Sequence, residues 1–271
     1  LAGKNVGVGA GAVVVRTTPQ ATWPAADAPI DGVFELSVAD LSTWSPWVPP
    51  GWRLGGGVRA SAGINGRFGA PEYTGMVTGT ALSVRNFVQG VNVQDGDVAI
   101  RLRGTTATIE RFVAKAGSGT LSLAGSASVG ESPKAALQVQ ADRFQLLGRI
   151  DRRIVASGDG RLRLDASSVA FDGQFKVDEG LVDFTRSDAP ALSSDVEIVR
   201  GKSDAQARAD AATSAPGVSR EVALDLRVGL GEKLRLRGRG LDTRLAGDLH
   251  ITSPAGRLTV NGTVRAVDGT Y

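Results

Sequence analysis

The chain of 271 residues lacks cysteine, contains one histidine, and has only 5% aromatic residues. Without cysteine, disulfides, thiolate nucleophiles and thiolate metal sites are excluded. The single His250 excludes sites with several histidine ligands. The chain also has no apolar run near the about 18 residues of a transmembrane helix, because its longest candidate covers residues 10–15. No stretch has the composition of a signal peptide.

Charge of one sign is not in large excess either. The 31 basic and 28 acidic residues leave a net charge of +3. A nucleic-acid-binding domain typically has a clear basic excess, so we expect no nucleic-acid partner.

What the chain does contain is glycine and a short alternating pattern of apolar and polar residues. Its 36 glycines are about twice the usual share. Residues 119–125, 160–165 and 256–262 share one short sequence pattern, in which two apolar residues stand two positions apart. Successive side chains of a strand point to opposite faces, so these apolar residues share one face. The pattern predicts strands almost throughout the chain.

Gly, Asn-Gly and Asp-Gly recur every 8 to 15 residues, which is typical of hairpins. We take Asp95-Gly96 and Asp172-Gly173 as two of these turns. At roughly 12 residues for a strand and its turn, the chain would form about 20 strands in a sheet about 100 Å long. Composition does not change along the chain, so residues 1–271 are predicted to be one continuous region. It begins at Leu1, and we expect it to be a fragment of a larger protein.

Two segments depart from the alternating pattern. Residues 41–48 contain Trp44, Pro46 and Trp47, which predicts a short helical turn that covers an apolar end with tryptophan rings. Residues 201–217 are rich in Ala, Ser and Asp without an apolar stripe, which predicts a mobile loop.

The long apolar face must be covered, and three arrangements would do so. A sandwich or solenoid needs large side chains from two layers. An outer-membrane barrel needs aromatic girdles, yet all four tryptophans lie between residues 23 and 52. The third arrangement is an open trough, and we predict it: an all-β, elongated, curled sheet with an apolar interior. A closed solenoid or sandwich without cargo is retained as an alternative.

The candidate binding residues are the apolar members of the alternating pattern. They are Val98, Ile100, Leu102, Leu121, Leu123, Leu137, Val139, Leu162, Leu164, Phe171, Phe175, Val177, Leu224, Leu226, Leu234, Leu236, Leu249, Ile251, Leu258 and Val260. In one interpretation they line a wall that holds acyl chains. In the other they are an ordinary core that contacts no ligand.

No pattern indicates chemistry. Residues 201–203 resemble the end of a phosphate-binding loop, but Val196 stands where that loop requires glycine. No serine has a basic or acidic partner at a known motif spacing. We therefore predict no catalytic residue, no metal site and no cofactor. Arg235, Arg237 and His250 alternate with apolar residues and are expected on the polar face.

Eight short sequence segments occur along the chain in an order that resembles their order in the TamB family. They are residues 41–50, 66–75, 90–96, 118–125, 173–184, 194–199, 240–248 and 262–271. The match is similar to the conserved C-terminal region of TamB, the translocation and assembly module protein, which belongs with the AsmA-like bridge-type lipid transfer proteins.

The resemblance implies a periplasmic β-structure whose parent protein is anchored in the inner membrane of a Gram-negative bacterium. Such proteins carry phospholipids along an apolar groove towards the outer membrane, so phospholipid acyl chains are an expected partner. TamB also takes part in outer-membrane protein assembly with TamA, a barrel partner met through regions outside this chain. An alternative role is therefore a chaperone-like scaffold that holds strands of outer-membrane proteins at an open sheet edge.

Overall fold

The computed structural model describes residues 2–3, 6–17, 23–128, 130, 133–185, 221–253 and 256–270. These residues form one sheet of fifteen strands and one short 3-10 helix. The predicted all-β class is thus confirmed, whereas the loop expected at 201–217 lies outside the described residues.

The first eight strands are β1 (Ala2–Gly3), β2 (Gly7–Val15), β3 (Ile30–Val38), β4 (Trp52–Arg67), β5 (Ala70–Asn86), β6 (Val91–Gly104), β7 (Thr106–Ala116) and β8 (Gly119–Ser128). The remaining strands are β9 (Lys134–Gly148), β10 (Arg152–Leu164), β11 (Ser168–Asp183), β12 (Glu221–Gly229), β13 (Leu234–Gly238), β14 (Leu241–Thr252) and β15 (Thr259–Thr270).

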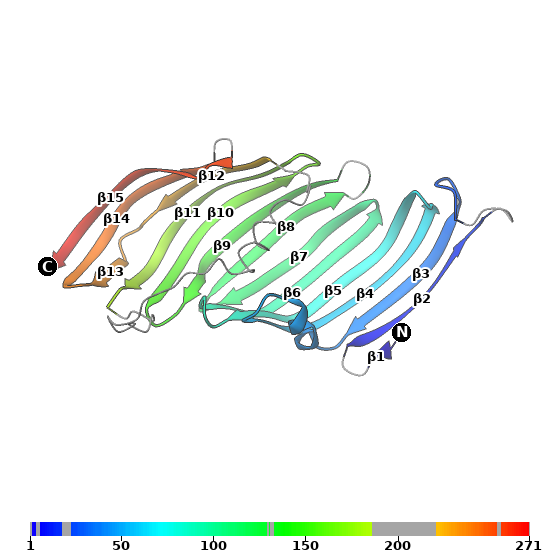
Figure 1. Cartoon of the computed structure of the whole chain (residues 1–271), viewed down its shortest axis with the longest axis horizontal. Coiled ribbons are helices and arrows are strands. Elements are labelled where there is room, and N and C mark those ends of the chain that lie inside the picture. The colour runs from blue at the N-terminus through cyan, green and yellow to red at the C-terminus, as the bar shows by residue number, and fades with distance from the viewer. Residues whose placement is uncertain are drawn as a thin grey trace, which may run out of the picture.

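From β1 to β11 each strand pairs antiparallel with the next one along the chain (Figure 1). The order then changes, because β12 and β13 both run parallel to β11 and lie end to end along it. β14 pairs antiparallel with both, and β15 pairs with β14. Since β12 and β13 share one position, the sheet is fourteen strands wide, or about 65 Å at about 4.8 Å per strand.

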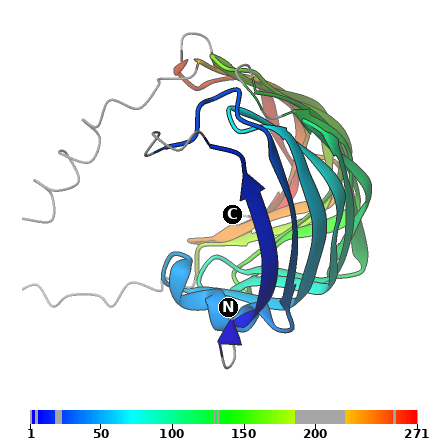
Figure 2. The same ribbon diagram turned by 90° about the vertical axis from the view of Figure 1, so that its right-hand side faces the viewer.

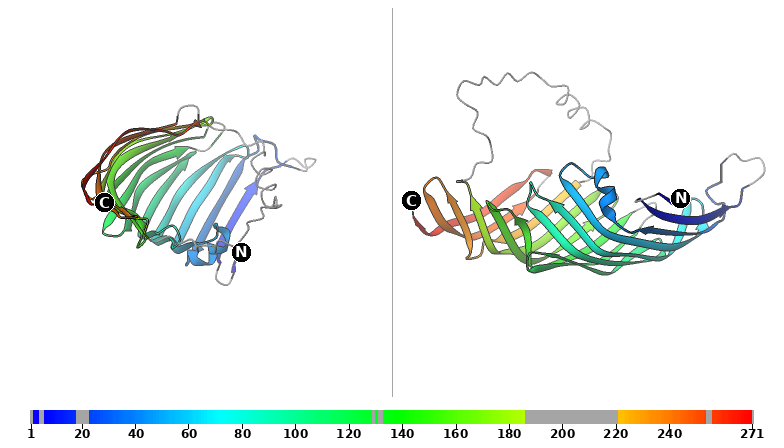
Figure 3. Two further views of the ribbon diagram at one scale, coloured as in Figure 1. Left: turned by 60° about the vertical axis from the view of Figure 1, so that its left-hand side comes forward. Right: turned by 90° about the horizontal axis from the view of Figure 1, so that it is seen from below.

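The strands curve along their length, so the sheet is a trough. Seen along the long axis, its section is an arc that is open on one side (Figure 2). Figure 3 shows the trough from two further directions. It is a single open layer and not a closed barrel, as predicted for the curled sheet. The predicted number of about 20 strands is wrong, because several strands have 14 to 17 residues.

Two predicted Asp-Gly turns are also wrong. β6 continues through Asp95 and Gly96 with a shift in register, and Asp95 has a positive φ of 51°. β11 passes through Asp172 and Gly173 without interruption. At Asp95 the residue adopts the φ of a bulge, which an Asp-Gly pair accepts as readily as that of a turn. Asp172 and Gly173 keep ordinary strand pairing without a shift in register.

The 3-10 helix η1 (Leu41–Trp47) confirms the predicted helical turn. The Asp40 side chain caps it by accepting a hydrogen bond from the Ser42 backbone N–H at 2.8 Å. Trp44 Nε1 donates to the carbonyl oxygen of Val6, which fixes η1 against the first strands. The predicted cover of two tryptophan rings is wrong in part, because Trp47 is 85% exposed.

Candidate functional site

One face of the sheet is apolar from its first strands to its last, as the strand register shows. Paired residues of neighbouring strands point to the same side. One row of partners reads Gly9, Leu36, Ala60, Val77, Ile100, Ile109, Gly125, Leu137, Leu162, Phe171 and Leu224. A second row reads Leu123, Val139, Gly160, Gly173, Leu226, Ile251 and Val260. We call the side that carries both rows the apolar face.

The predicted wall residues fall on this face with one exception. Val98 pairs with Phe112, Val177 with Ala156 and Leu234 with Leu245, so each has an apolar partner on this face. The other predicted residues lie in the two rows or at alternate positions of the strands that carry these rows and pairs, and therefore point to the same side. The exception is Leu258, which lies before β15 begins, so strand register does not assign it to a face.

The apolar face also extends over strands that the sequence pattern did not nominate. Phe34, Leu36, Val58 and Val84 belong to it through their partners in β4, β5 and β6. In β4, Ala60 and Ala62 occupy the same face as Val58, so small residues weaken the apolar pattern of that strand. The alternation of Phe34, Leu36 and Val38 was a usable signal.

The opposite face is a lattice of charged and polar side chains. Arg163 contacts Asp172 at 2.6 Å, and His250 contacts Asp225 at 2.7 Å. Arg235 and Arg237 both bind Asp242. Asp242 consequently has a lowered pKa, with the Arg235 hydrogen bond as the main cause. These contacts confirm that the arginines and His250 lie on the polar face.

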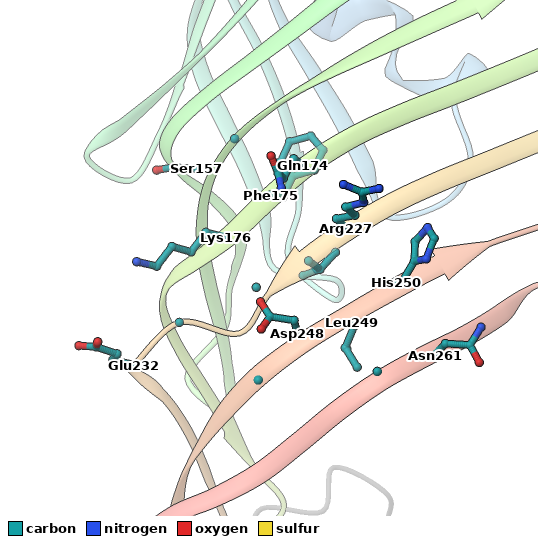
Figure 4. A pocket seen from close by; sticks show the side chains of 16 residues that line it. Ser157, Gln174, Phe175, Lys176, Arg227, Glu232, Asp248, Leu249, His250 and Asn261 are labelled. Carbon is teal, nitrogen blue, oxygen red and sulfur yellow. The ribbon is translucent and has the colours of Figure 1, made fainter.

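A hollow in this polar face lies where β11, β12, β14 and β15 adjoin (Figure 4). Arg227 and His250 line it side by side, and Lys176 and Asp248 lie farther along. Among the described residues, no group of three or more His, Asp and Glu side chains is placed to hold a metal ion. No hydroxyl group of a described residue bonds to His250, which is paired with Asp225 instead.

The apolar face is the inner face of the trough. Phe144 points to that side and is 5% exposed, and Ala114, Ala156 and Val177 are also buried. The helix η1 lies on the inner side at one rim (Figure 2), next to the buried Val38 of the apolar face. A concave surface brings side chains together, whereas a convex one spreads them apart and leaves room for solvated charges.

Small residues give this face its curvature. Gly125 has φ +138° and Gly158 has φ +155°, values that favour glycine. A Cβ at Gly125 would collide with the carbonyl oxygen of Ala136, and one at Gly158 with that of Gln174. The strands approach each other so closely at these points that the sheet can bend.

A cluster of charges stands at the rim that also carries η1. The Asp151 carboxylate is 5% exposed and accepts hydrogen bonds from Arg149 Nε at 2.7 Å and Arg152 Nε at 3.1 Å. The bond from Arg149 is the main reason that the pKa of Asp151 falls to about 2. Arg149 Nη1 also donates to the carbonyl oxygen of Val88 at 2.6 Å, which ties two hairpin ends together.

Comparison with known families decides where the chain belongs. The family model of the TamB C-terminal domain matches residues 110–271, which extend from within β7 to the end of the chain. The chain belongs to the TamB family. No curated protein and no solved structure matches the chain.

TamB proteins are transport-related, non-enzymatic proteins of the Gram-negative envelope. In this TamB chain, no described helix is long and apolar enough to span a bilayer. Its matched part contains the parallel junction of β11 with β12 and β13 and most of the inner apolar rows. An extended sheet of this kind fits a bridge-like transport role in this family.

Proposed function

We propose that the trough is a non-enzymatic hydrophobic groove that carries phospholipids between the inner and outer membranes of a Gram-negative envelope. The observation that supports this most directly is the unbroken apolar row from β2 to β12. No second layer of the described chain covers that row. We further propose that the chain lies in the periplasm, that its parent protein is anchored in the inner membrane, and that a TamA-type barrel is its outer-membrane partner.

The energetics explain why such a groove is useful. Exposing acyl chains to water costs about 0.8 kcal/mol per CH₂, so two chains of about sixteen carbons cost on the order of 25 kcal/mol. A continuous apolar face removes most of this barrier without any chemistry, while the headgroup stays in water at the open side. Branched and small side chains suit this role, because they leave space for an acyl chain between the rims.

Photo-crosslinking tests the proposal. A photoreactive residue at Leu123 on the inner face should form phospholipid adducts. The same residue at Ala124, the next position of β8, is the control, because Ala124 is exposed and points outward. The proposal fails if Leu123, Ile100 and Leu226 all give no lipid adduct while a known groove protein does so under the same conditions.

A second candidate function is the holding of unfolded outer-membrane strands. β15 pairs only with β14 among the described residues and is exposed along most of its length. Its free N–H and C=O groups can pair with a strand of a client protein. Photo-crosslinkers at Thr263 and Arg265 of β15 that capture peptides, with no lipid adduct from the inner face, would favour this function.

A further inference from the structure

The inner face carries one strand cation among the described residues. Of the lysines and arginines within described strands, Arg152 alone is in register with the apolar face. It pairs with Val182, and Val182 pairs in turn with Leu236. Ile154 follows two residues later on the same side of β10. A guanidinium group therefore stands where the apolar wall begins, at the rim of the trough.

The backbone beneath this side chain is fixed. The Arg149 N–H donates to the carbonyl oxygen of Arg152 at 2.8 Å, which closes the turn between β9 and β10. The Asp183 N–H donates to the carbonyl oxygen of Asp151 at 2.8 Å, which attaches the same turn to the end of β11. Arg152 is thus placed by two neighbouring strands, and its position does not depend on a ligand.

Two guanidinium groups share the buried carboxylate of Asp151. Arg149 Nε lies 2.7 Å from Oδ1, and Arg152 Nε lies 3.1 Å from Oδ2. Arg149 is 21% exposed and serves the turn, whereas Arg152 is 58% exposed and uses only its Nε on Asp151. The two Nη groups of Arg152 have no partner among the described residues. They leave a fork of donors available at the mouth of the groove.

We propose that Arg152 binds the phosphate of a phospholipid whose acyl chains lie on the inner face beside Val182 and Ile154. This inference rests on the proposed lipid groove and names its headgroup site. The planar fork of an arginine matches phosphate oxygens in a bidentate way. Asp151 holds Nε, so the remaining donors are oriented before the ligand arrives. The lipid is then held at both ends, with its chains on the apolar wall and its phosphate at the rim.

The test compares two fluorescent lipids with identical acyl chains, phosphatidylglycerol and diacylglycerol. Arg152→Gln should weaken the binding of phosphatidylglycerol about tenfold, or about 1.4 kcal/mol, and leave diacylglycerol unchanged. Arg152→Lys, which keeps the charge but loses the fork, should give an intermediate loss. Arg161→Gln is the matched control, because Arg161 lies on the same strand, is exposed, and points to the polar face. Thermal unfolding checks that each variant is folded.

The outcomes separate the two proposals. If the unaltered chain binds neither lipid, the groove itself is wrong. If it binds both and Arg152→Gln weakens both equally or neither, the groove stands and the headgroup site is overturned. Glycerol phosphate without acyl chains is the third probe. If it binds to Arg152 as tightly as the phospholipid does, the site serves free phosphates and the lipid assignment is wrong.

Discussion

The bend of the sheet depends on single glycines, and Gly158 is the most direct case. Gly158 has a backbone φ of +155°, and a side chain there would collide with the carbonyl oxygen of Gln174. We expect Gly158→Ala to lower the free energy of unfolding by about 2 kcal/mol, because the residue can neither fit nor adopt that φ easily. Gly63→Ala is the control, since a Cβ at Gly63 has nothing nearer than 3.7 Å. Denaturant unfolding measures both, and equal stability of the two variants would contradict the role of Gly158.

Asp151 makes the stability of the rim depend on pH. Its pKa is lowered from the ordinary 3.8 to about 2 by its hydrogen bonds to arginine. A carboxylate with a depressed pKa stabilises the folded state above its unfolded pKa, and this contribution is lost as the pH falls through the folded pKa. We therefore expect wild-type stability to drop between pH values of about 4 and about 2.

The variant Asp151→Asn should show a smaller drop over that range and lower stability at neutral pH. Asp159→Asn is a matched control for the loss of one carboxylate, because Asp159 lies in β10, which begins directly after Asp151. Asp159 is exposed and lacks an ion pair among the described residues. Thermal unfolding as a function of pH measures the effect. Parallel pH curves for wild type and Asp151→Asn would rule out a stabilising role for this carboxylate.

Among the elements, the junction of β11 with β12 and β13 contains a cluster of buried apolar side chains. Val177, Leu230 and Leu234 form a buried cluster, with Ile154 and Leu245 packed against it. We expect Leu234→Ala to destabilise the chain by about 2–3 kcal/mol, because it opens a cavity at a place where strands from distant parts of the sequence meet. Leu258→Ala should change stability by less than about 0.5 kcal/mol, since Leu258 is exposed. Urea denaturation compares the two leucine variants, and similar losses would contradict this view of the junction.

The same junction marks what the sequence could not reveal. Alternation at Val222, Leu224 and Leu226 predicts a strand and its inner face, and both are found. It contains no information on the neighbour, so the parallel pairing of β12 with β11 was not foreseen. Hairpin neighbours are close in sequence and follow from short turns, whereas a parallel pair is joined by a long connection that leaves no local signal.

Bulges were the other source of error at this scale. Asp95 and Asp268 each have a positive φ inside a strand. A local pattern cannot distinguish such a bulge from a turn, because the same residue types favour both. Faces were still assigned correctly beyond the bulges, since alternation resumes on each side of the extra residue. The apolar wall was therefore easier to predict than the number of strands.

At the scale of the molecule, the sheet gains its cohesion mainly from the pairing of neighbouring strands. The turns at 86–91 and 148–152, which belong to hairpins that are not neighbours in the sheet, are bonded to each other as well. Each strand packs on the strands beside it, and no second layer of described residues lies over the inner face. A protein that buried its apolar residues for stability alone would close this face, as sandwiches and barrels do. An open apolar wall of this length is instead a surface that needs an occupant, which favours the groove over a purely structural role.

A lipid that moves along a continuous groove must pass every position of that groove, and this gives a prediction about combined variants. Leu123 and Leu226 lie on one row of the inner face, four strands apart. Leu123→Arg or Leu226→Arg alone should stop phospholipid transfer by the full-length protein, because a charge in the apolar path is a barrier wherever it lies. The double variant should be no worse than either one. Ala124→Arg, on the outer face of β8, should leave transfer unchanged. Independent binding patches would give partial, multiplying losses instead, so transfer rates of the four proteins decide between a continuous path and separate sites.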